Sequence, residues 1–425
     1  MPDRTVAPPI KDAIAFDIVL KPLERFSLKN GTPVYFINDG AEEVAVLELV
    51  FSAGNIFENK NLVAAATNHL IKNGTSQKTA LEINERFDYY GAYLNSSCHN
   101  EFASITLHCL SRHIEELLPL VRELITDTIF PQHELEIFQK NSIQRLAVNL
   151  KKSDFVANRL IDKYLYGPDH PYGRISSEVD IKAIERQDLV DFFKHFYLNA
   201  KCTIFAAGKL PENFTGQLNH NFGDLALNEN QPVIIHKCEL AVERKIRITN
   251  DPKSVQGAIR IARPFPNSHH ADFKKAKVLN VLFGGYFSSR LMANIREEKG
   301  YTYGIHSYIE NHVQESAWVI STEAGKEVCE ATVEEVYKEM KIMREQSVDN
   351  EELLLVKNYI MGLTLGDVDG PFHIIERWKN LILKGHDEKY FYEYIHAIKN
   401  ISVKEIMELS NKYLLPEEFF ELIVI

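Results

Sequence analysis

An ordered set of features occurs twice along the 425 residues, and this repetition limits the chain to a fold made of two related halves. A helix pattern through Lys140-Asn141 precedes Ala183-Ile184 in the first copy, and a helix pattern through Lys357-Asn358 precedes Ala397-Ile398 in the second. Both pairs are offset by about 215 residues, a domain-sized period that indicates duplication rather than a solenoid of short repeats.

Strand patterns open and close each copy. Alternating and β-branched residues bounded by turn residues predict strands, and long amphipathic helix patterns separate them. We therefore predict an α+β fold class with two homologous α/β-sandwich domains, each a mostly antiparallel sheet with helices packed on one face. The predicted strands are 34–37, 44–51, 92–97, 103–109 and 202–207 in the first copy, and 245–248, 256–261, 302–309, 317–322 and 419–424 in the second.

A chain of this length is too long for one ordinary core. Its 45% apolar content suffices for two cores. We expect an N-terminal extension at 1–22, a first domain at 23–209, a linker at 210–233 that is rich in Asn and Gly, and a second domain at 234–425.

The composition argues against several partners. Acidic and basic residues are mixed along the chain and the net charge is −11, so we expect no nucleic acid. Residues 1–9 lack the pattern of a signal peptide, and no apolar run reaches the roughly 18 residues of a membrane span, so we expect no membrane partner. The five widely spaced cysteines form no Cys-x-x-Cys pair, which favours reduced thiols and a cytoplasmic location.

The segment Ala65-Ala66-Thr67-Asn68-His69 resembles an inverted zinc motif that has lost its ligands. In the intact motif, His-x-x-Glu-His, two imidazoles share a helix face and the Glu serves as general base. Ala65 has no ligand atom, and the amide of Asn68 cannot accept and return a proton as a carboxylate does. Only His69 remains, and we interpret it as a hydrogen-bonded helix residue.

The third ligand of such a site is missing as well. Proteins with the intact motif carry a Glu on a later helix, roughly 75 residues downstream. The segment from Ile137 to Ser153 contains no Asp or Glu, and position 145 is Arg, which has the wrong charge for a cation site. We therefore predict no metal site in this chain.

Short landmarks in both halves carry a resemblance to a known family. The landmarks are Leu28–Gly31, Phe51–Gly54, His69–Thr75, Gly91–Asn95, His170–Gly173, Gly284–Leu291 and Arg296–Tyr303. Together and in this order, they make the chain similar to the insulinase/pitrilysin (inverzincin) family of zinc metallopeptidases, from about Leu23 to the last residue. Within that family it resembles a two-domain bacterial-type or mitochondrial-processing-peptidase-like subunit that lacks the zinc motif.

The resemblance implies that this chain forms half of a clamshell chamber built from four such units, so a second chain must complete it. In that family an Arg and a Tyr seven residues apart in the non-zinc half reach the bound peptide, and Arg296 and Tyr303 have this spacing. A guanidinium and a phenol can both hydrogen-bond a peptide carbonyl or a developing oxyanion. Zinc is then expected in the partner and not in this chain.

Three hypotheses follow. In the first, the chain is the non-zinc subunit of a peptidase and acts on peptides together with a zinc-bearing homologous subunit. In the second, it is a catalytically silent peptide-binding or scaffold pseudoenzyme that forms a homodimer. In the third, it is a zinc metallopeptidase whose fold recruits non-standard ligands. The first two expect this chain to be inactive alone.

Overall fold

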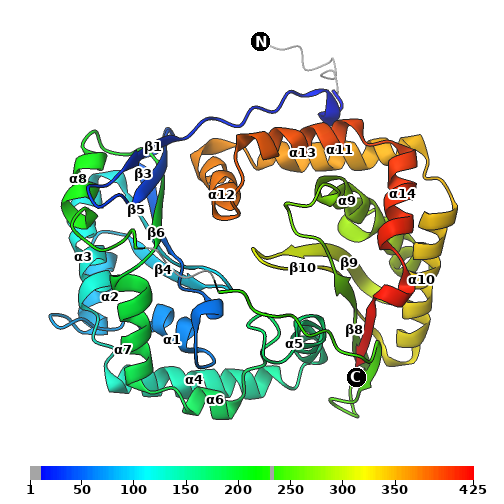
Figure 1. Cartoon of the computed structure of the whole chain (residues 1–425), viewed down its shortest axis with the longest axis horizontal. Coiled ribbons are helices and arrows are strands. Elements are labelled where there is room, and N and C mark those ends of the chain that lie inside the picture. The colour runs from blue at the N-terminus through cyan, green and yellow to red at the C-terminus, as the bar shows by residue number, and fades with distance from the viewer. Residues whose placement is uncertain (1–10, 230–233) are drawn as a thin grey trace, which may run out of the picture.

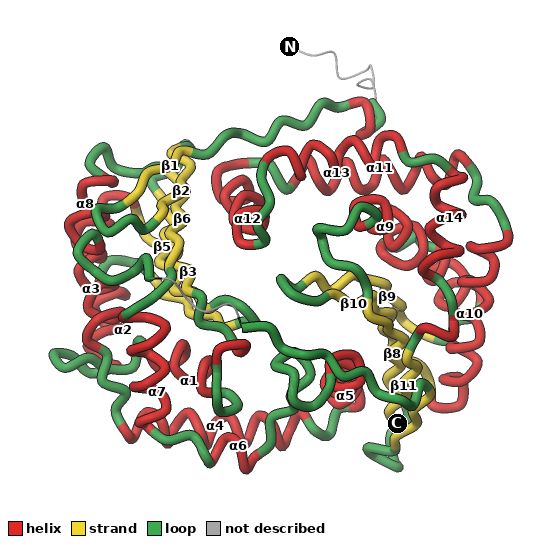
Figure 2. Tube along the Cα trace, viewed as in Figure 1, coloured by secondary structure: helices red, strands yellow, loops and turns green. Residues whose placement is uncertain are grey.

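Two β-sheets, each backed by helices, form the framework of the chain. The computed structural model describes residues 11–229 and 234–425. Figure 1 shows the two halves side by side, and Figure 2 shows both sheets turned towards the interior with most helices on the outside. The predicted fold class is therefore confirmed.

The first sheet has six strands in the order β1-β2-β6-β3-β5-β4. Its pairs are antiparallel except β2 with β6. Strand β1 was not predicted, because its polar residues lie on the exposed sheet edge and show no alternation. The strands are β1 (Glu24–Ser27), β2 (Pro33–Asn38), β3 (Val44–Phe51), β4 (Tyr93–Cys98), β5 (Ala103–Leu110) and β6 (Cys202–Gly208).

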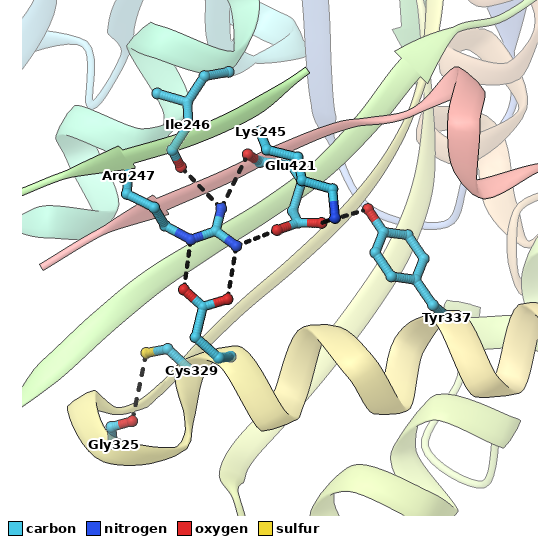
Figure 3. Close-up of polar contacts among 8 residues, drawn as sticks. Lys245, Ile246, Arg247, Gly325, Cys329, Tyr337 and Glu421 are labelled. Atoms are coloured by element: carbon cyan, nitrogen blue, oxygen red, sulfur yellow. Dashed lines mark hydrogen bonds and ion pairs between the residues drawn. The ribbon is translucent and has the colours of Figure 1, made fainter. Parts of the chain in front are cut away.

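The second sheet has five strands in the order β7-β11-β8-β10-β9, with β7 and β11 parallel. Figure 3 shows a polar network beside this parallel pair, in which Arg247 and Tyr337 both contact the buried carboxylate of Glu421. Tyr337 donates to Glu421 Oε2 at 2.9 Å and so ties a covering helix to the sheet. The strands are β7 (Lys245–Ile248), β8 (Gln256–Pro264), β9 (Thr302–Asn311), β10 (Ser316–Gly325) and β11 (Phe420–Val424).

The covering helices are amphipathic and bury one apolar face. In the C-terminal helix, Ile406, Leu409 and Tyr413 recur at helical spacing and are buried, and Ser402 and Glu405 form a capping box at its start. The first half carries α1 (Val63–Leu70), α2 (Ala80–Tyr89), α3 (Ile114–Asp127), α4 (Gln132–Asn149), α6 (Glu178–Lys182), α7 (Arg186–Phe193) and α8 (Phe214–Phe222), and the second carries α9 (Phe273–Asn280), α10 (Cys329–Glu345), α11 (Asn350–Gly366), α13 (Glu388–Asn400) and α14 (Val403–Tyr413). The π-helices are η4 (Lys194–Leu198), η5 (Val281–Gly285) and η6 (Met292–Glu298), and the 3₁₀ turns are η1 (Ala13–Ala15), η2 (Asn55–Phe57), η3 (Ser111–His113), η7 (Lys326–Val328) and η8 (Pro416–Glu418).

The two halves exchange one helix each. Helix α5 (Ser153–Tyr166) of the first half packs on β8 and β11 of the second sheet, and α12 (Gly370–Leu383) of the second half packs on β2 and β6 of the first. Ile161 of α5 shares a core with Phe420, whereas Ile375 of α12 shares a core with Phe205. A helix therefore also packs on part of the second face of each sheet, where the sequence predicted helices on one face only.

Reciprocal ion pairs accompany this exchange. Lys379 of α12 pairs with Glu48 of β3 at 2.7 Å, and Arg260 of β8 pairs with Asp154 of α5. Glu48 and Arg260 occupy equivalent places, since each lies on the strand antiparallel to the last strand of its half. The ion pair to the exchanged helix therefore uses an acidic residue on the first sheet and a basic residue on the second sheet.

The segments predicted as linker and extension have defined places. Helix α8 lies inside the predicted linker 210–233, and its Phe214, Leu218 and Phe222 are buried in the core of the first half. The linker prediction is therefore wrong for this helix, because a run rich in Asn and Gly hid three core residues at helical spacing. Residues 230–233 lie outside the described part of the chain.

Of the predicted extension 1–22, residues 1–10 also lie outside the described part. The remainder crosses from β1 to the second half (Figure 1), where Ile18 and Leu20 are buried in its core. Trp378 of α12 donates from Nε1 to the carbonyl oxygen of Lys21 at 2.9 Å. Among the described helices, none is both long enough and apolar enough to cross a membrane.

Candidate functional site

Helix α1 carries the degenerate motif, and Asn68 is part of the core there. Its side chain is only 2% exposed, and its Nδ2 donates to the carbonyl oxygen of Ser104 at 3.2 Å and to the hydroxyl of Tyr197 at 3.1 Å. The amide therefore joins the helix to β5 and to η4. A group with both donor hydrogens engaged in the core has a structural role and cannot serve as a base.

His69 lies one residue further along the same helix. Its ring packs against that of Phe138 with centroids 5.3 Å apart. Desolvation, followed by the charges of Lys72 and Arg145, lowers the pKa of His69 below its ordinary value. The expectation of a hydrogen-bonded residue is corrected, because the described residues hold this ring through an aromatic contact instead.

Arg145 reaches the position where a third metal ligand would be needed. Helix α4 packs on α1, and a small cavity of about 50 Å³ is lined by His69, Glu134 and Arg145 together. Asn73 donates to Glu134 Oε2 at 2.7 Å, so that carboxylate already has a partner. The positive charge of the exposed Arg145 beside a single imidazole repels a divalent cation.

These residues do not fit a zinc ion. Ala65 has no donor atom, Asn68 is engaged in the core, and a cation stands beside His69. Within residues 11–229 and 234–425, no three His, Cys, Asp or Glu side chains are grouped so that they could hold a metal. Three ligands are the usual minimum for a catalytic zinc.

The structure brings Arg296 and Tyr303 together. Arg296 is in the last turn of π-helix η6, Gly300 turns the chain with a left-handed φ of +66°, and β9 begins directly afterwards. The guanidinium carbon lies 4.4 Å from the ring centroid of Phe287 and 5.7 Å from that of Tyr303. Two aromatic rings therefore orient the arginine.

Both members of the pair keep unused hydrogen-bonding groups. Arg296 Nη1 is buried and has no hydrogen-bond partner among the described residues. Tyr303 is 93% exposed and Phe287 is 61% exposed, which is unusual for large aromatic side chains in a folded chain. Strand β9 is the outer strand of its sheet, and part of its outer edge is occupied within the chain, since Ile305 N donates to Met292 Sδ and Asn280 Nδ2 donates to the carbonyl oxygen of Ser307. The cluster can donate hydrogen bonds to a carbonyl or an oxyanion outside this chain.

The cavities that lie along α12 could not be predicted from the sequence. One of them, of about 660 Å³, lies between α12 and the face of β3, β4 and β5. Tyr93 and His108 stack in its wall with ring centroids 4.3 Å apart, and Glu48 and Lys379 meet there. Its lining comes from both halves, and no local pattern could place α12 on the first sheet.

The fold and this site define a metallopeptidase-like protein of two α/β halves, with the metal position degenerate in the first half and an Arg/Tyr cluster in the second. Two family models match: insulinase (peptidase family M16) over residues 34–166, and the peptidase M16 inactive domain over residues 183–360. The chain belongs to the peptidase M16 (insulinase) family, and the resemblance found in the sequence is confirmed.

Related proteins cover the chain almost completely. It is 20% identical over 395 residues to the uncharacterized zinc protease YmxG of Bacillus subtilis, covering 92% of this chain and 95% of that protein. The peptidase M16 inactive domain from Pseudomonas fluorescens has the same fold, with a TM-score of 0.83, 21% identity, and 95% and 98% of the two chains covered. The periplasmic protease PqqL from Escherichia coli matches all of this chain but only 48% of its own, with a TM-score of 0.78 and 13% identity.

Proposed function

We propose that this chain is the non-zinc subunit of a two-chain M16-type peptidase. It contributes the chamber wall and the Arg296/Tyr303 pair, and a zinc-bearing homologous subunit contributes the metal. The observation that carries this proposal is the contrast between the two halves. The metal position of the first half contains Arg145, whereas the second half presents Arg296 with an unpartnered Nη1 beside an almost fully exposed Tyr303.

The length relation to PqqL supports a second unit. This chain matches PqqL over its whole length but takes up only 48% of that protein, so PqqL has room for two such units in one polypeptide. Here, a second chain would supply the other unit. The Arg296/Tyr303 pair would then face a peptide held between the subunits.

The test is reconstitution with a zinc-bearing homologue from the same source. Peptide hydrolysis is expected only from the mixture, and Arg296→Ala is expected to lower kcat/KM by about 10²-fold because a transition-state donor is lost. Tyr303→Phe, which removes one hydroxyl, is expected to have a smaller effect in the same direction. Arg112→Ala and Tyr89→Phe change exposed side chains in the first half and serve as matched controls.

The outcome against the proposal is equally specific. If the mixture hydrolyses peptides and neither Arg296→Ala nor Tyr303→Phe slows it more than the controls do, the pair is structural. If no zinc-bearing homologue confers activity, the subunit role is wrong.

A homodimeric scaffold is the second candidate. Helices α4 and α11 occupy equivalent places in the duplication, and both expose apolar side chains. Ile137 and Val148 of α4 are 50% and 59% exposed, and Leu355 and Leu363 of α11 are 63% and 54% exposed. Such faces suit a second copy of the same chain. Sedimentation equilibrium of the purified chain tests whether it forms a homodimer. A tight homodimer that also gains no activity from any zinc-bearing homologue supports the scaffold over the subunit role.

A further inference from the structure

A second cavity carries a charge pattern that the proposed function does not use. It has a volume of about 330 Å³ and lies between α9, β9 and the end of α12. Three cationic side chains, Lys277, Arg377 and Lys384, line it together with His386. The described residues in its wall include no Asp or Glu. In a chain of net charge −11, this concentration of positive charge is a local feature.

Lys277 is the least compensated of these cations. Its Nζ lies 4.3 Å from the ring centroid of Tyr394, and it forms no ion pair with a described residue. Burial, with the neighbouring charge of Arg377, lowers the pKa of Lys277 to about 8. Lys277 is half-buried and has no ion-paired acid among the described residues, and an anion in the pocket would supply a partner for its ammonium group.

The other two cations are only partly neutralised. Arg377 donates from Nη2 to Asp367 Oδ2 at 2.7 Å, but its Nε is buried without a partner. Lys384 donates from Nζ to the carbonyl oxygen of Asn311 at 2.8 Å, which leaves its charge unpaired. The acids that act on the cluster are Asp367, outside the lining, and Glu101 in the adjoining cavity. The pocket therefore has an excess of positive charge.

The pocket adjoins a second cavity. Asn311, Asn380 and Lys384 also line a neighbouring cavity of about 360 Å³. That cavity shares Glu48 and Lys379 with the cavity of about 660 Å³, so the three cavities follow one another along α12.

We propose that this pocket binds an oxyanion that carries two or more carboxylate groups. A volume of about 330 Å³ is within the range of small-ligand sites. The free Nε of Arg377 and the ammonium of Lys277 provide charge-assisted donors, and Asn380 adds an amide. The carboxylates belong either to a free small molecule or to acidic residues of a peptide in the chamber, and the experiment separates these sources.

The experiment is isothermal titration calorimetry of the full chain with three probes. Citrate represents the free small molecule, a short Glu-rich peptide with an amidated C-terminus represents acidic side chains, and the same peptide with Gln is its neutral match. We expect citrate or the Glu peptide, but not the Gln peptide, to bind with Kd below about 1 mM. Lys277→Met should weaken this binding at least tenfold and Lys277→Arg should restore most of it. Lys389→Met, on the exposed face of α13, should not change it.

Each result decides the proposal. Binding of citrate alone assigns the pocket to a small molecule, binding of the Glu peptide alone assigns it to acidic peptides, and either supports an oxyanion site. Binding of neither probe, or equal binding by Lys277→Met, overturns the proposal.

Lys277→Met should unfold at a higher urea concentration than the wild-type chain without ligand, since the substitution removes a charge that has no ion pair. Lys384→Gln provides a second variant. Because the assay uses neither a partner nor zinc, its failure is independent of the proposed subunit role.

Discussion

The ion pair between α12 and the first sheet leads to a quantitative prediction. Glu48 is 9% exposed, and Lys379 is the only cation with which it pairs among the described residues. Lys379→Met would leave a buried carboxylate without its partner, a change that costs about 3–5 kcal/mol in a dry core. Glu48 also lines cavities of about 660 and 360 Å³, which have room for water. We therefore expect a loss of about 2 kcal/mol in the free energy of unfolding.

Urea unfolding followed by tryptophan fluorescence measures this loss. Trp378 precedes Lys379 on α12, is 8% exposed, and reports release of the helix from the first half. Lys404→Met is the matched control: it removes a lysine that is 86% exposed and 3.7 Å from Glu408, and it should cost less than about 0.5 kcal/mol.

A double variant separates lost charge from lost packing. Glu48→Gln with Lys379→Met removes both charges and should recover most of the stability lost in Lys379→Met alone. The reasoning is refuted if Lys379→Met unfolds at the same urea concentration as Lys404→Met, or if the double variant is as unstable as the single one.

Three further predictions concern titration and metal binding. Folding lowers the pKa of Lys277 from 10.5 to about 8, so between these pH values the unfolded chain binds one more proton than the folded chain. The free energy of unfolding of the wild type, measured in urea relative to Lys277→Met, should therefore rise from pH 8 to 10.5. Burial lowers the pKa of His170 from 6.5 to about 4, so only the unfolded chain is protonated in that window and stability relative to His170→Asn should fall as the pH drops from 6.5 to 4. The variant Ala65→His with Arg145→Glu supplies two ligands beside His69, and elemental analysis should find close to one zinc per chain against less than about 0.1 in the wild type; equal zinc contents would contradict our account of the degenerate motif.

Much of the fold could be predicted from the sequence because most strands carry their own local signal. The alternation in 245–248 and 256–261 gave strands close to those observed as β7 and β8. Strand β1 gave no such signal, and helix α8 was concealed by its composition. The exchange of α5 and α12 was beyond prediction, since an amphipathic pattern shows that a helix has a buried face but not which sheet covers it.

The candidate sites differ in the same way. Arg296 and Tyr303 lie seven residues apart across one turn, so their proximity follows from a short spacing, and their role in substrate binding stays a prediction. The cationic pocket draws Lys277 and Lys384 from helices more than one hundred residues apart. Each is an ordinary lysine in its own segment, and only the tertiary fold joins them.

Because α12 belongs to the second half, the inner face of the first sheet can be covered only late in synthesis. The inner face of the first sheet includes Ile37, Val50 and Phe205, which share a core with residues of α12. Those side chains leave the ribosome long before residue 383, so this apolar face stays uncovered while almost half of the protein is still to be made. A nascent first half is therefore a natural client for a chaperone, and premature termination before α12 yields a fragment that is prone to aggregate.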